Sequence, residues 1–352
     1  MYLFIGVLVG GMALLDIYCT RWLPLLKVYL YSLLSIFLFI IIAYRECGFD
    51  YDSYMGIYQD LHSSAWINNA SVWGMEWGYG FINYICTSFR QLLIVMAFLT
   101  VTSYAIFVYR YSPLPFFSLF LFLGILYGGM MGQYRQSLAV GIVLLAVSVR
   151  KSRIAFISLL AIAVLFHTSA VLAVILLFLS EKLYSLKSYL YLMLLALVGN
   201  LVGGEVLAVF TANLPDIMQN KLEYYTNAEA GMVFGFNLAM FLRIFVFGYL
   251  WKKRDLIGMY PSGFFFFNAY FLSLLFYLGL GFLPQLAGRG TIYFSVFEFM
   301  LPAMVIAQDR KARCGIIAFF FISIYRQLSL LTGEGSTEYL PYRSALEQWF
   351  GI

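Results

Sequence analysis

Residues Tyr127–Ser169 read YGGMMGQYRQSLAVGIVLLAVSVRKSRIAFISLLAIAVLFHTS. Two apolar runs in this stretch flank a basic turn, Arg150–Arg153. Arg135 stands at the start of the first run, and His167 stands at the end of the second, which is unusually short. An ionisable side chain in or near the hydrocarbon of a membrane is costly and by default marks a functional site that faces a wet cavity. The stretch therefore predicts both a membrane fold and the centre of its site.

The composition of the whole chain agrees with a membrane protein. Of its 352 residues, 63% are hydrophobic and only 11% are charged, whereas about 25% of an average soluble domain is charged. Backbone polar groups inside a bilayer need partners within the chain, so the spans are expected to be helices. The predicted fold class is all-α, a polytopic helical membrane protein with about 11–12 transmembrane helices. The net charge of +5 comes from basic residues scattered at helix ends, which argues against a nucleic-acid partner.

Apolar segments near the length of about 20 residues that a bilayer requires follow one another along the chain. They are Tyr2–Cys19, Leu25–Ala43, Gln91–Tyr109, Leu114–Met131, Tyr134–Val149, Ile154–Phe166, Ala170–Leu183, Tyr189–Val209, Phe236–Trp251, Gly263–Pro284, Thr291–Ala307 and Cys314–Leu331. Polar segments are expected to form outer loops at residues 44–90 and 211–235 and an outer C-terminal tail at residues 332–352. We expect a single integral membrane domain over residues 1–352.

Lysine and arginine in short loops orient the helices, because such loops stay on the cytoplasmic side. The basic positions are Arg21/Lys27, Arg110, Arg150–Arg153, Lys182/Lys187, Lys252–Arg254 and Arg310–Arg313. Between Arg150 and Lys182 the chain must then cross the membrane and return, with His167 near the middle. About 13 residues of helix rise roughly 20 Å, which is less than the hydrocarbon thickness of about 30 Å. His167 is therefore expected at the tip of a short hairpin, inside the outer half of the membrane.

The same orientation assigns the remaining charges of the spans to their outer halves. These basic residues are Arg135, Arg243, Arg289 and Arg326. Acidic residues gather in the outer loops and the tail. The sequence thus predicts an outward-facing polar cavity that is basic at depth and acidic at its rim.

All the deep basic residues are arginines, whose guanidinium group binds phosphate oxygens through paired hydrogen bonds and keeps its charge when buried. Arg135 and Arg289 stand in glycine-rich sequence, GGMMGQYRQ and LAGRGTIYF, and no carboxylate stands close to them in the loops. They are the leading candidates for binding an anion. The alternative is that the deep arginines are structural and pair with Glu205, Glu298 or backbone carbonyls.

The candidates for a general base are a histidine and two carboxylates. His167 can accept a proton near neutral pH, the alternative being a hydrogen-bonded cap of the hairpin. Glu76 lies in an aromatic amphipathic stretch, GMEWGYGFINYI, which either binds sugar or anchors the chain at the membrane interface. Asp52 forms an Asp-x-Asp pair with Asp50, for which an acidic loop is a simpler interpretation than a metal site. We predict no metal and no cofactor, since the sequence has no Cys/His cluster and no phosphate-binding loop.

Several short blocks follow one another in an order that is typical of one family. They are DYDSYMGIYQD, WGYGFINYI, GQYRQSLAVGIVLLA, LFHTSAVL, GRGTIYFSVFEFMLP and YLPYRS, spread over residues 45–345. In this order the chain resembles the EpsG-like, Wzy-type polysaccharide polymerases of bacteria. The resemblance implies a GT-C-like glycosyltransferase in the bacterial inner (cytoplasmic) membrane. Such enzymes join undecaprenyl-pyrophosphate-linked oligosaccharide repeats on the periplasmic side, making O-antigen for lipopolysaccharide, capsule or exopolysaccharide, and a chain-length regulator is an expected partner.

The resemblance also implies residue roles. Its YRQ and RxxxYF blocks supply substrate-binding residues, here Arg135, Gln136, Arg289 and Tyr293, and its FH(T)S block supplies His167. Leaving pyrophosphate carries negative charge, which fixed cations can stabilise, so the predicted reaction is a metal-independent, inverting glycosyl transfer. The alternative function is a flippase or transporter of the same lipid-linked oligosaccharides, which would also need a basic cavity.

Overall fold

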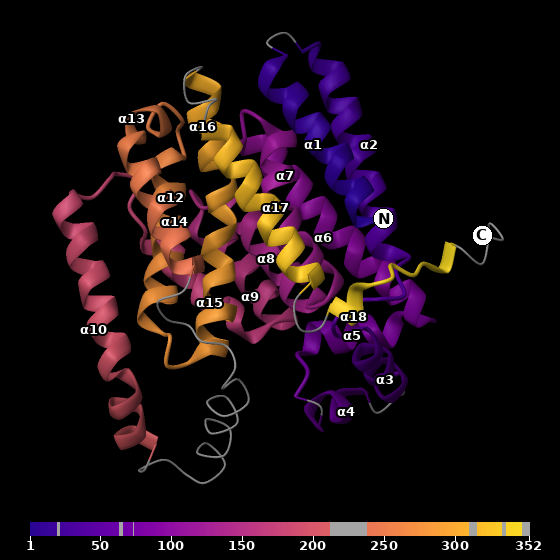
Figure 1. Cartoon of the computed structure of the whole chain (residues 1–352). Helices are drawn as coiled ribbons and strands as arrows, with labels where there is room; N and C mark the ends of the chain where they lie inside the picture. The colour runs from indigo at the N-terminus through magenta and orange to yellow at the C-terminus, as the bar shows by residue number, and fades with distance from the viewer. Residues whose placement is uncertain are drawn as a thin grey trace. The chain divides into compact units, whose positions relative to one another are not determined.

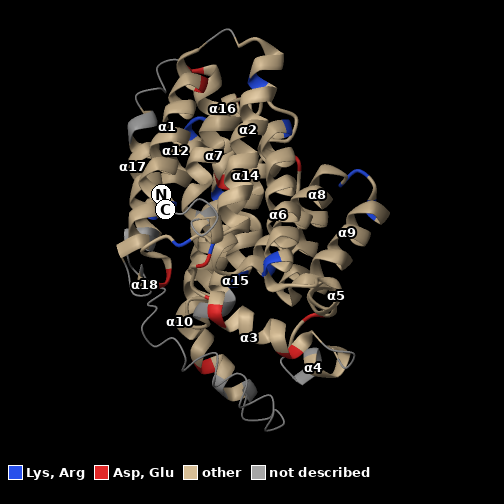
Figure 2. Cartoon of the chain, turned by 90° about the vertical axis from the view of Figure 1, so that its right-hand side faces the viewer, with Lys and Arg blue, Asp and Glu red and all other residues tan. Residues whose placement is uncertain are grey.

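The computed structural model describes residues 1–19, 22–62, 66–72, 74–211, 238–309, 315–332 and 336–346. The described residues are 82% helical, and they contain no β-strand. Helices long and apolar enough to cross a membrane are present in the described part at Pro24–Ala43, Phe89–Tyr111, Leu186–Leu207 and Ala287–Gln308, and shorter apolar helices accompany them. Charged residues are sparse among the apolar helices (Figure 2). The predicted class, an all-α polytopic membrane protein, is confirmed.

Most predicted spans coincide with helices to within a few residues. These helices are α1 (Tyr2–Tyr18), α2 (Pro24–Ala43), α6 (Phe89–Tyr111), α7 (Pro115–Ile125), α8 (Tyr134–Ser148), α9 (Arg153–Phe166), α10 (Leu186–Thr211), α12 (Leu238–Lys252), α14 (Gly263–Gly279) and α17 (Ile316–Thr332) (Figure 1). The short α13 (Arg254–Ile257) precedes α14, and a π-helical turn, η1 (Leu126–Met130), continues α7. The apolar runs therefore sufficed to find the helices.

Two predicted spans are built differently from the expectation. The segment Ala170–Leu183 begins as a 3-10 helix, η2 (Thr168–Phe178), whose rise of about 2.0 Å per residue lets a short segment cover more of the membrane than an α-helix. The span Thr291–Ala307 starts earlier and is divided into α15 (Pro284–Ser295), the 3-10 turn η3 (Val296–Phe299) and α16 (Leu301–Gln308). Pro302 explains the division, because it has no N–H to donate to the preceding turn.

The contacts between helices divide the chain into two compact units. Unit 1 comprises Met1–Leu177 and Pro302–Ile352, and its central helix is α8, most of whose side chains are buried. Helix α8 packs on α6 and α9, α6 packs on α2, and α7 packs on α1 and α17. Gly141 allows the approach of α8 to α6, because a Cβ there would lie 3.1 Å from the Cβ of Ser103.

A buried ion pair joins the first helices of unit 1. Lys27 Nζ lies 2.8 Å from Asp16 Oδ1, and the Asp16 side chain is fully buried. The other oxygen of Asp16 accepts the backbone N–H of Phe116 at 3.0 Å. The carboxylate of α1 thus fixes both the start of α2 and the start of α7.

Unit 2, Phe178–Leu301, is centred on α14, whose phenylalanines are buried. Helices α10, α12 and α15 pack around it. Asn268 of α14 accepts a hydrogen bond from the Tyr189 hydroxyl of α10. Its amide donates to the carbonyls of Ser180 (2.8 Å) and Lys182 (3.0 Å), so this buried polar side chain is satisfied.

The predicted outer loop at residues 44–90 is largely helical. It contains α3 (Tyr51–Leu61), α4 (Trp66–Val72) and α5 (Trp77–Ile85). The predicted outer loop thus carries helices of its own, and the aromatic amphipathic stretch after Glu76 forms α5, which packs against α9. The predicted loop at 211–235 lies outside the described residues from position 212 onward, as do Arg21 and the basic cluster Arg310–Arg313.

The predicted tail returns to the first outer loop. After α18 (Ser336–Tyr339), Arg343 accepts the N–H of Glu46 at 2.8 Å, and Ser344 forms an antiparallel bridge with Arg45. Gly48 donates its N–H to the carbonyl of Glu338 at 2.7 Å. Gly48 has φ +126°, and a Cβ there would lie 2.1 Å from the carbonyl oxygen of Met131, so only glycine fits.

Candidate functional site

Arg135 and Glu76 form an ion pair in unit 1. Arg135 Nη1 lies 2.6 Å from Glu76 Oε2, and the two side chains are 16% and 13% exposed. Arg135 Nε donates to the Tyr54 hydroxyl of α3 at 3.0 Å. The expectation that Arg135 has no local carboxylate was wrong, because Glu76 stands 59 residues away in the chain and reaches Arg135 only through the fold. The partner is also not one of the glutamates proposed in the structural alternative.

The second carboxylate oxygen of Glu76 accepts hydrogen bonds from Thr168, which follows His167. Thr168 donates to Glu76 Oε1 from its backbone N–H (3.0 Å) and from its hydroxyl (3.3 Å). His167 is the C-cap of α9 with extended backbone (φ −157°, ψ 117°), and its Nδ1 lies 2.7 Å from Ser169 Oγ. The structure therefore brings together three predicted site residues. Arg135 and Glu76 touch directly, and His167 joins them through its neighbour Thr168.

A glycine makes the contact between Glu76 and Thr168 possible. Glu76 is the N-cap of α5, which packs against α9. A Cβ at Gly78 would lie 2.7 Å from the carbonyl oxygen of Leu165, in the last turn of α9. The close approach of the two helices requires the bare backbone of Gly78, which accounts for the Gly of the WGYG block.

Tyrosines surround the guanidinium group of Arg135. It lies 5.4 Å from the ring centroids of both Tyr54 and Tyr79. The rings of Tyr54 and Tyr134 are 4.0 Å apart, and the hydroxyls of Tyr79 and Tyr134 are 2.9 Å apart. Burial raises the pKa of Tyr54 and Tyr79, so both phenols stay neutral and can act as hydrogen-bond donors. This tyrosine cluster adds cation–π attraction to the ion pair that holds Arg135 in place.

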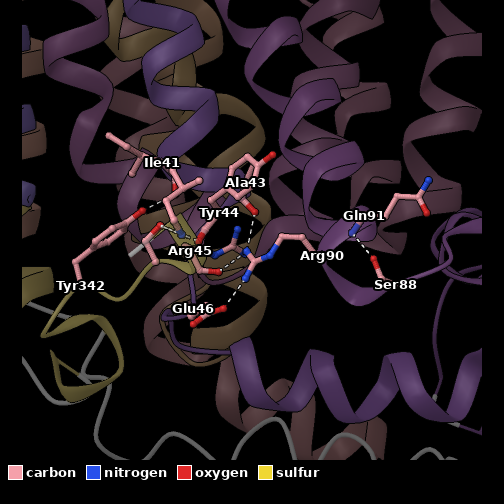
Figure 3. Close-up of polar contacts among 11 residues, drawn as sticks. Ile41, Ala43, Tyr44, Arg45, Glu46, Ser88, Arg90, Gln91 and Tyr342 are labelled. Carbon is pink, nitrogen blue, oxygen red and sulfur yellow. Dashed lines mark hydrogen bonds and ion pairs between the residues drawn. The ribbon is translucent and has the colours of Figure 1, made fainter. Parts of the chain in front are cut away.

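Arg45, which the sequence did not single out, lies next to Tyr134 of the tyrosine cluster, and Figure 3 shows it between the end of α2 and Arg90. The Arg45 side chain is buried, Nε donates to the carbonyl of Met131 at 3.0 Å, and Nη1 donates to that of Ile42 at 2.6 Å. Its guanidinium lies 5.6 Å from the Tyr134 ring, and Nη2 has no hydrogen-bond partner among the described residues. Arg45 thus ties the end of α2 to the turn that presents Tyr134 and Arg135.

A second arginine and the terminal YLPYRS block hold Arg45 from two sides (Figure 3). Arg90 of α6 donates to the carbonyl of Arg45 at 2.9 Å and to Glu46 Oε1 at 2.8 Å. On the other side, the Tyr342 hydroxyl donates to the carbonyl of Ile41 at 2.9 Å. The connection that leaves α2 is therefore fixed by α6 and by the C-terminal segment together.

The remaining predicted residues of unit 1 lie outside this network. Asp52 is exposed in the first turn of α3, and Gln136 is buried on α8. Arg326 is half-buried on α17, where Gly124 of α7 allows its backbone to approach closely. Within the described ranges, no group of three or more His, Cys, Asp or Glu could hold a metal ion.

Unit 2 contains the other predicted arginines. Arg243 of α12 lies 4.9 Å from the ring centroid of Tyr277, and its Nη1 is buried without a hydrogen-bond partner in the described part of the chain. It stacks on an aromatic ring, and among the described residues no carboxylate, including that of Glu298, pairs with it. Arg289 is exposed on α15, and Tyr293 of the same helix is fully buried.

Comparison with known proteins adds one match. The model of the EpsG family matches residues 28–344, a range that contains the ion pair of Arg135 and Glu76, the histidine block and the candidate arginines Arg243, Arg289 and Arg326. No curated protein and no solved structure matches the chain.

Proposed function

This chain belongs to the EpsG family, and we propose that it is a polymerase of undecaprenyl-pyrophosphate-linked oligosaccharide repeat units at the outer face of the inner membrane. The family itself supports a polysaccharide-polymerase role. The observation that carries the finer proposal is the network of Arg135, Glu76 and Thr168. This network brings together an arginine that can bind phosphate, a carboxylate and the segment that contains His167, although the three are far apart in the sequence.

Arg135 is the residue that we assign to the pyrophosphate of the donor. Its Nη1 and Nε are occupied by Glu76 and Tyr54, and within the described residues Nη2 makes no hydrogen bond. A phosphate oxygen at Nη2 would gain a charge-assisted hydrogen bond. Because Glu76 and the tyrosine cluster already fix the guanidinium, it can stabilise the charge that develops on the leaving pyrophosphate without reorganising.

His167 is the side chain that we assign as general base. Glu76 is less suited, because both its oxygens already accept hydrogen bonds, and Asp52 lies apart from the network. In the reaction, the acceptor hydroxyl oxygen bonds to the anomeric carbon of the donor, and the bond from that carbon to the pyrophosphate oxygen breaks. The hydroxyl proton passes to the base, and attack opposite the pyrophosphate inverts the anomeric carbon.

The test is an assay of the purified full-length protein with a defined lipid-linked repeat unit and no nucleotide. A ladder of longer lipid-linked products is expected, and it should be lost in the Arg135→Gln variant at normal protein levels. A protein that yields no ladder but moves the lipid-linked unit across the membrane of a proteoliposome would be a flippase, and the proposal would be wrong.

A further inference from the structure

A groove runs along the outside of unit 1 between α2 and α6, which lie side by side (Figure 2). Its volume is about 590 Å³, within the range of roughly 300–1,000 Å³ typical of pockets that hold small ligands. Apolar side chains form most of its length, among them Ile36, Phe39, Phe98 and Ile106. Only 28% of the apolar membrane-spanning segment of α2 is buried, so this helix and the groove face the lipid.

One end of the groove carries a cation. Arg110, in the last turn of α6, lines the groove and is exposed. In the described ranges no carboxylate lies within ion-pair distance of it, and its guanidinium group lies 5.5 Å from the centroid of the Tyr111 ring. Lys27, which adjoins the same end, is already neutralised by Asp16 at 2.8 Å. The groove therefore ends at an uncompensated positive charge.

This end lies at the opposite face of the membrane from the candidate site. Arg90, at the other end of α6, contacts Arg45 beside the tyrosine cluster. The 20 positions between Arg90 and Arg110 correspond to about 30 Å of helix, the thickness of the hydrocarbon core. A lipid whose pyrophosphate lies at Arg135 cannot also place that group at Arg110. The occupant of the groove is therefore a different lipid, from the leaflet that the basic loops identify as cytoplasmic.

We propose that the groove binds one anionic phospholipid, with its phosphate at Arg110 and an acyl chain along α2 and α6. A guanidinium group binds phosphate oxygens in pairs, and basic pockets between membrane helices are suited to anionic headgroups. Tyr31 and Tyr109, whose rings are 5.2 Å apart, line the same end and suit the level at which aromatic side chains meet the headgroups. The bound chain fills the space between two helices whose far ends hold Arg45.

The test is native mass spectrometry of the purified full-length protein titrated with phosphatidylglycerol or phosphatidylcholine. We expect phosphatidylglycerol to bind about fivefold more tightly, the factor typical of one basic residue at an anionic surface. Arg110→Gln should remove that preference. Arg153→Gln is the matched control, because Arg153 is also exposed, belongs to a basic turn and does not line the groove. Thr102→Phe, which fills the groove, should weaken the binding of both lipids.

Several results would overturn the assignment. Equal binding of the two lipids would show that the groove does not recognise an anionic headgroup. Equal losses of the preference in Arg110→Gln and Arg153→Gln would show that surface charge alone produces it. Unchanged binding in Thr102→Phe would mean that the groove is not the site. Displacement of phosphatidylglycerol by undecaprenyl phosphate at a lower concentration would assign the groove to the substrate lipid. Thermal unfolding shows whether each variant is folded. If Thr102→Phe is not folded, the comparison of Arg110→Gln with Arg153→Gln decides whether the groove binds the anionic lipid.

Discussion

Replacing Gly78 by alanine should disable the site without changing a charge or a polar group. A Cβ at position 78 would lie 2.7 Å from the carbonyl oxygen of Leu165, where ordinary contact begins at 3.4 Å, so α5 must move by about 3.4 − 2.7 = 0.7 Å. Glu76 precedes α5, and its bonds to Thr168 at 3.0 and 3.3 Å would lengthen to about 3.7 and 4.0 Å, beyond hydrogen-bonding reach.

The cost of this displacement has two parts. Overpacking of the α5–α9 contact should destabilise the fold by about 1–3 kcal/mol. A misplacement of about 1 Å at a catalytic constellation lowers rates by roughly 100-fold. We therefore expect Gly78→Ala to lower polymerisation by between tenfold and 100-fold at equal amounts of folded protein.

Gly56→Ala is the matched control, because Gly56 lies in the helix α3 and a Cβ there meets no atom within 4 Å. Alanine should even stabilise that helix by about 0.5–1 kcal/mol. The two variants are compared by product-ladder length and initial rate on the same lipid-linked substrate, with thermal unfolding as the measure of folding. If Gly78→Ala polymerises within twofold of Gly56→Ala, the bond from Thr168 to Glu76 does not matter for activity.

Four further predictions concern other candidate residues and metal dependence. Arg135→Lys and Arg289→Lys keep the positive charge but lose the planar set of N–H donors of the guanidinium group. Each should therefore lower activity at least about tenfold, and full activity in both variants would contradict phosphate binding by these residues. Polymerisation should persist in EDTA, and a loss that Mg²⁺ or Mn²⁺ restores would reassign the acidic outer loop to the reaction. His167→Ala should stop chain growth but keep substrate binding. A cysteine in place of Ser169 should react with a membrane-impermeant thiol reagent added from the periplasmic side. Labelling only from the cytoplasm would refute the predicted orientation. Arg45→Gln should lower both the unfolding temperature and, by about tenfold, the rate, since it leaves the buried carbonyl of Met131 without its donor.

The helices could be predicted because a bilayer imposes their composition and length. The apolar runs that predicted α1, α2, α6, α8 and α14 end close to the observed helix ends. Composition carries no comparable information on helix type, so the 3-10 geometry of η2 was not foreseen. The sequence indicates an amphipathic stretch around Glu76 in the outer loop, but no bounds for the helices α3, α4 and α5 followed from it. These helices bury only one aromatic face against unit 1, and a search for long apolar runs does not detect so narrow a stripe.

The site could be predicted only as separate residues. Arg135 and His167 were found because a charge inside an apolar run is conspicuous. Their connection through Glu76 depends on sequence separations of 59 and 92 residues, which no local pattern records. Thr168 belongs to the FH(T)S block, but its bond to Glu76 depends on the close approach of α5 to α9 at Gly78, which is a tertiary feature.

Arg45 shows most clearly how burial can hide a residue from sequence analysis. In the segment YRECGFD it has the appearance of one charge among others at the rim of the membrane. In the fold it is buried, and the terminal YLPYRS block, about 300 residues later, bridges to it through Ser344 and bonds to its neighbour Tyr44. The same block reaches the turn before α8, where the Tyr339 hydroxyl lies 3.5 Å from the carbonyl of Gly128 and a Cβ at Gly132 would lie 2.8 Å from that hydroxyl. The terminal block therefore acts on Arg135 from a distance. It bridges to Arg45, and Arg45 bonds to Met131 in the turn that precedes Arg135.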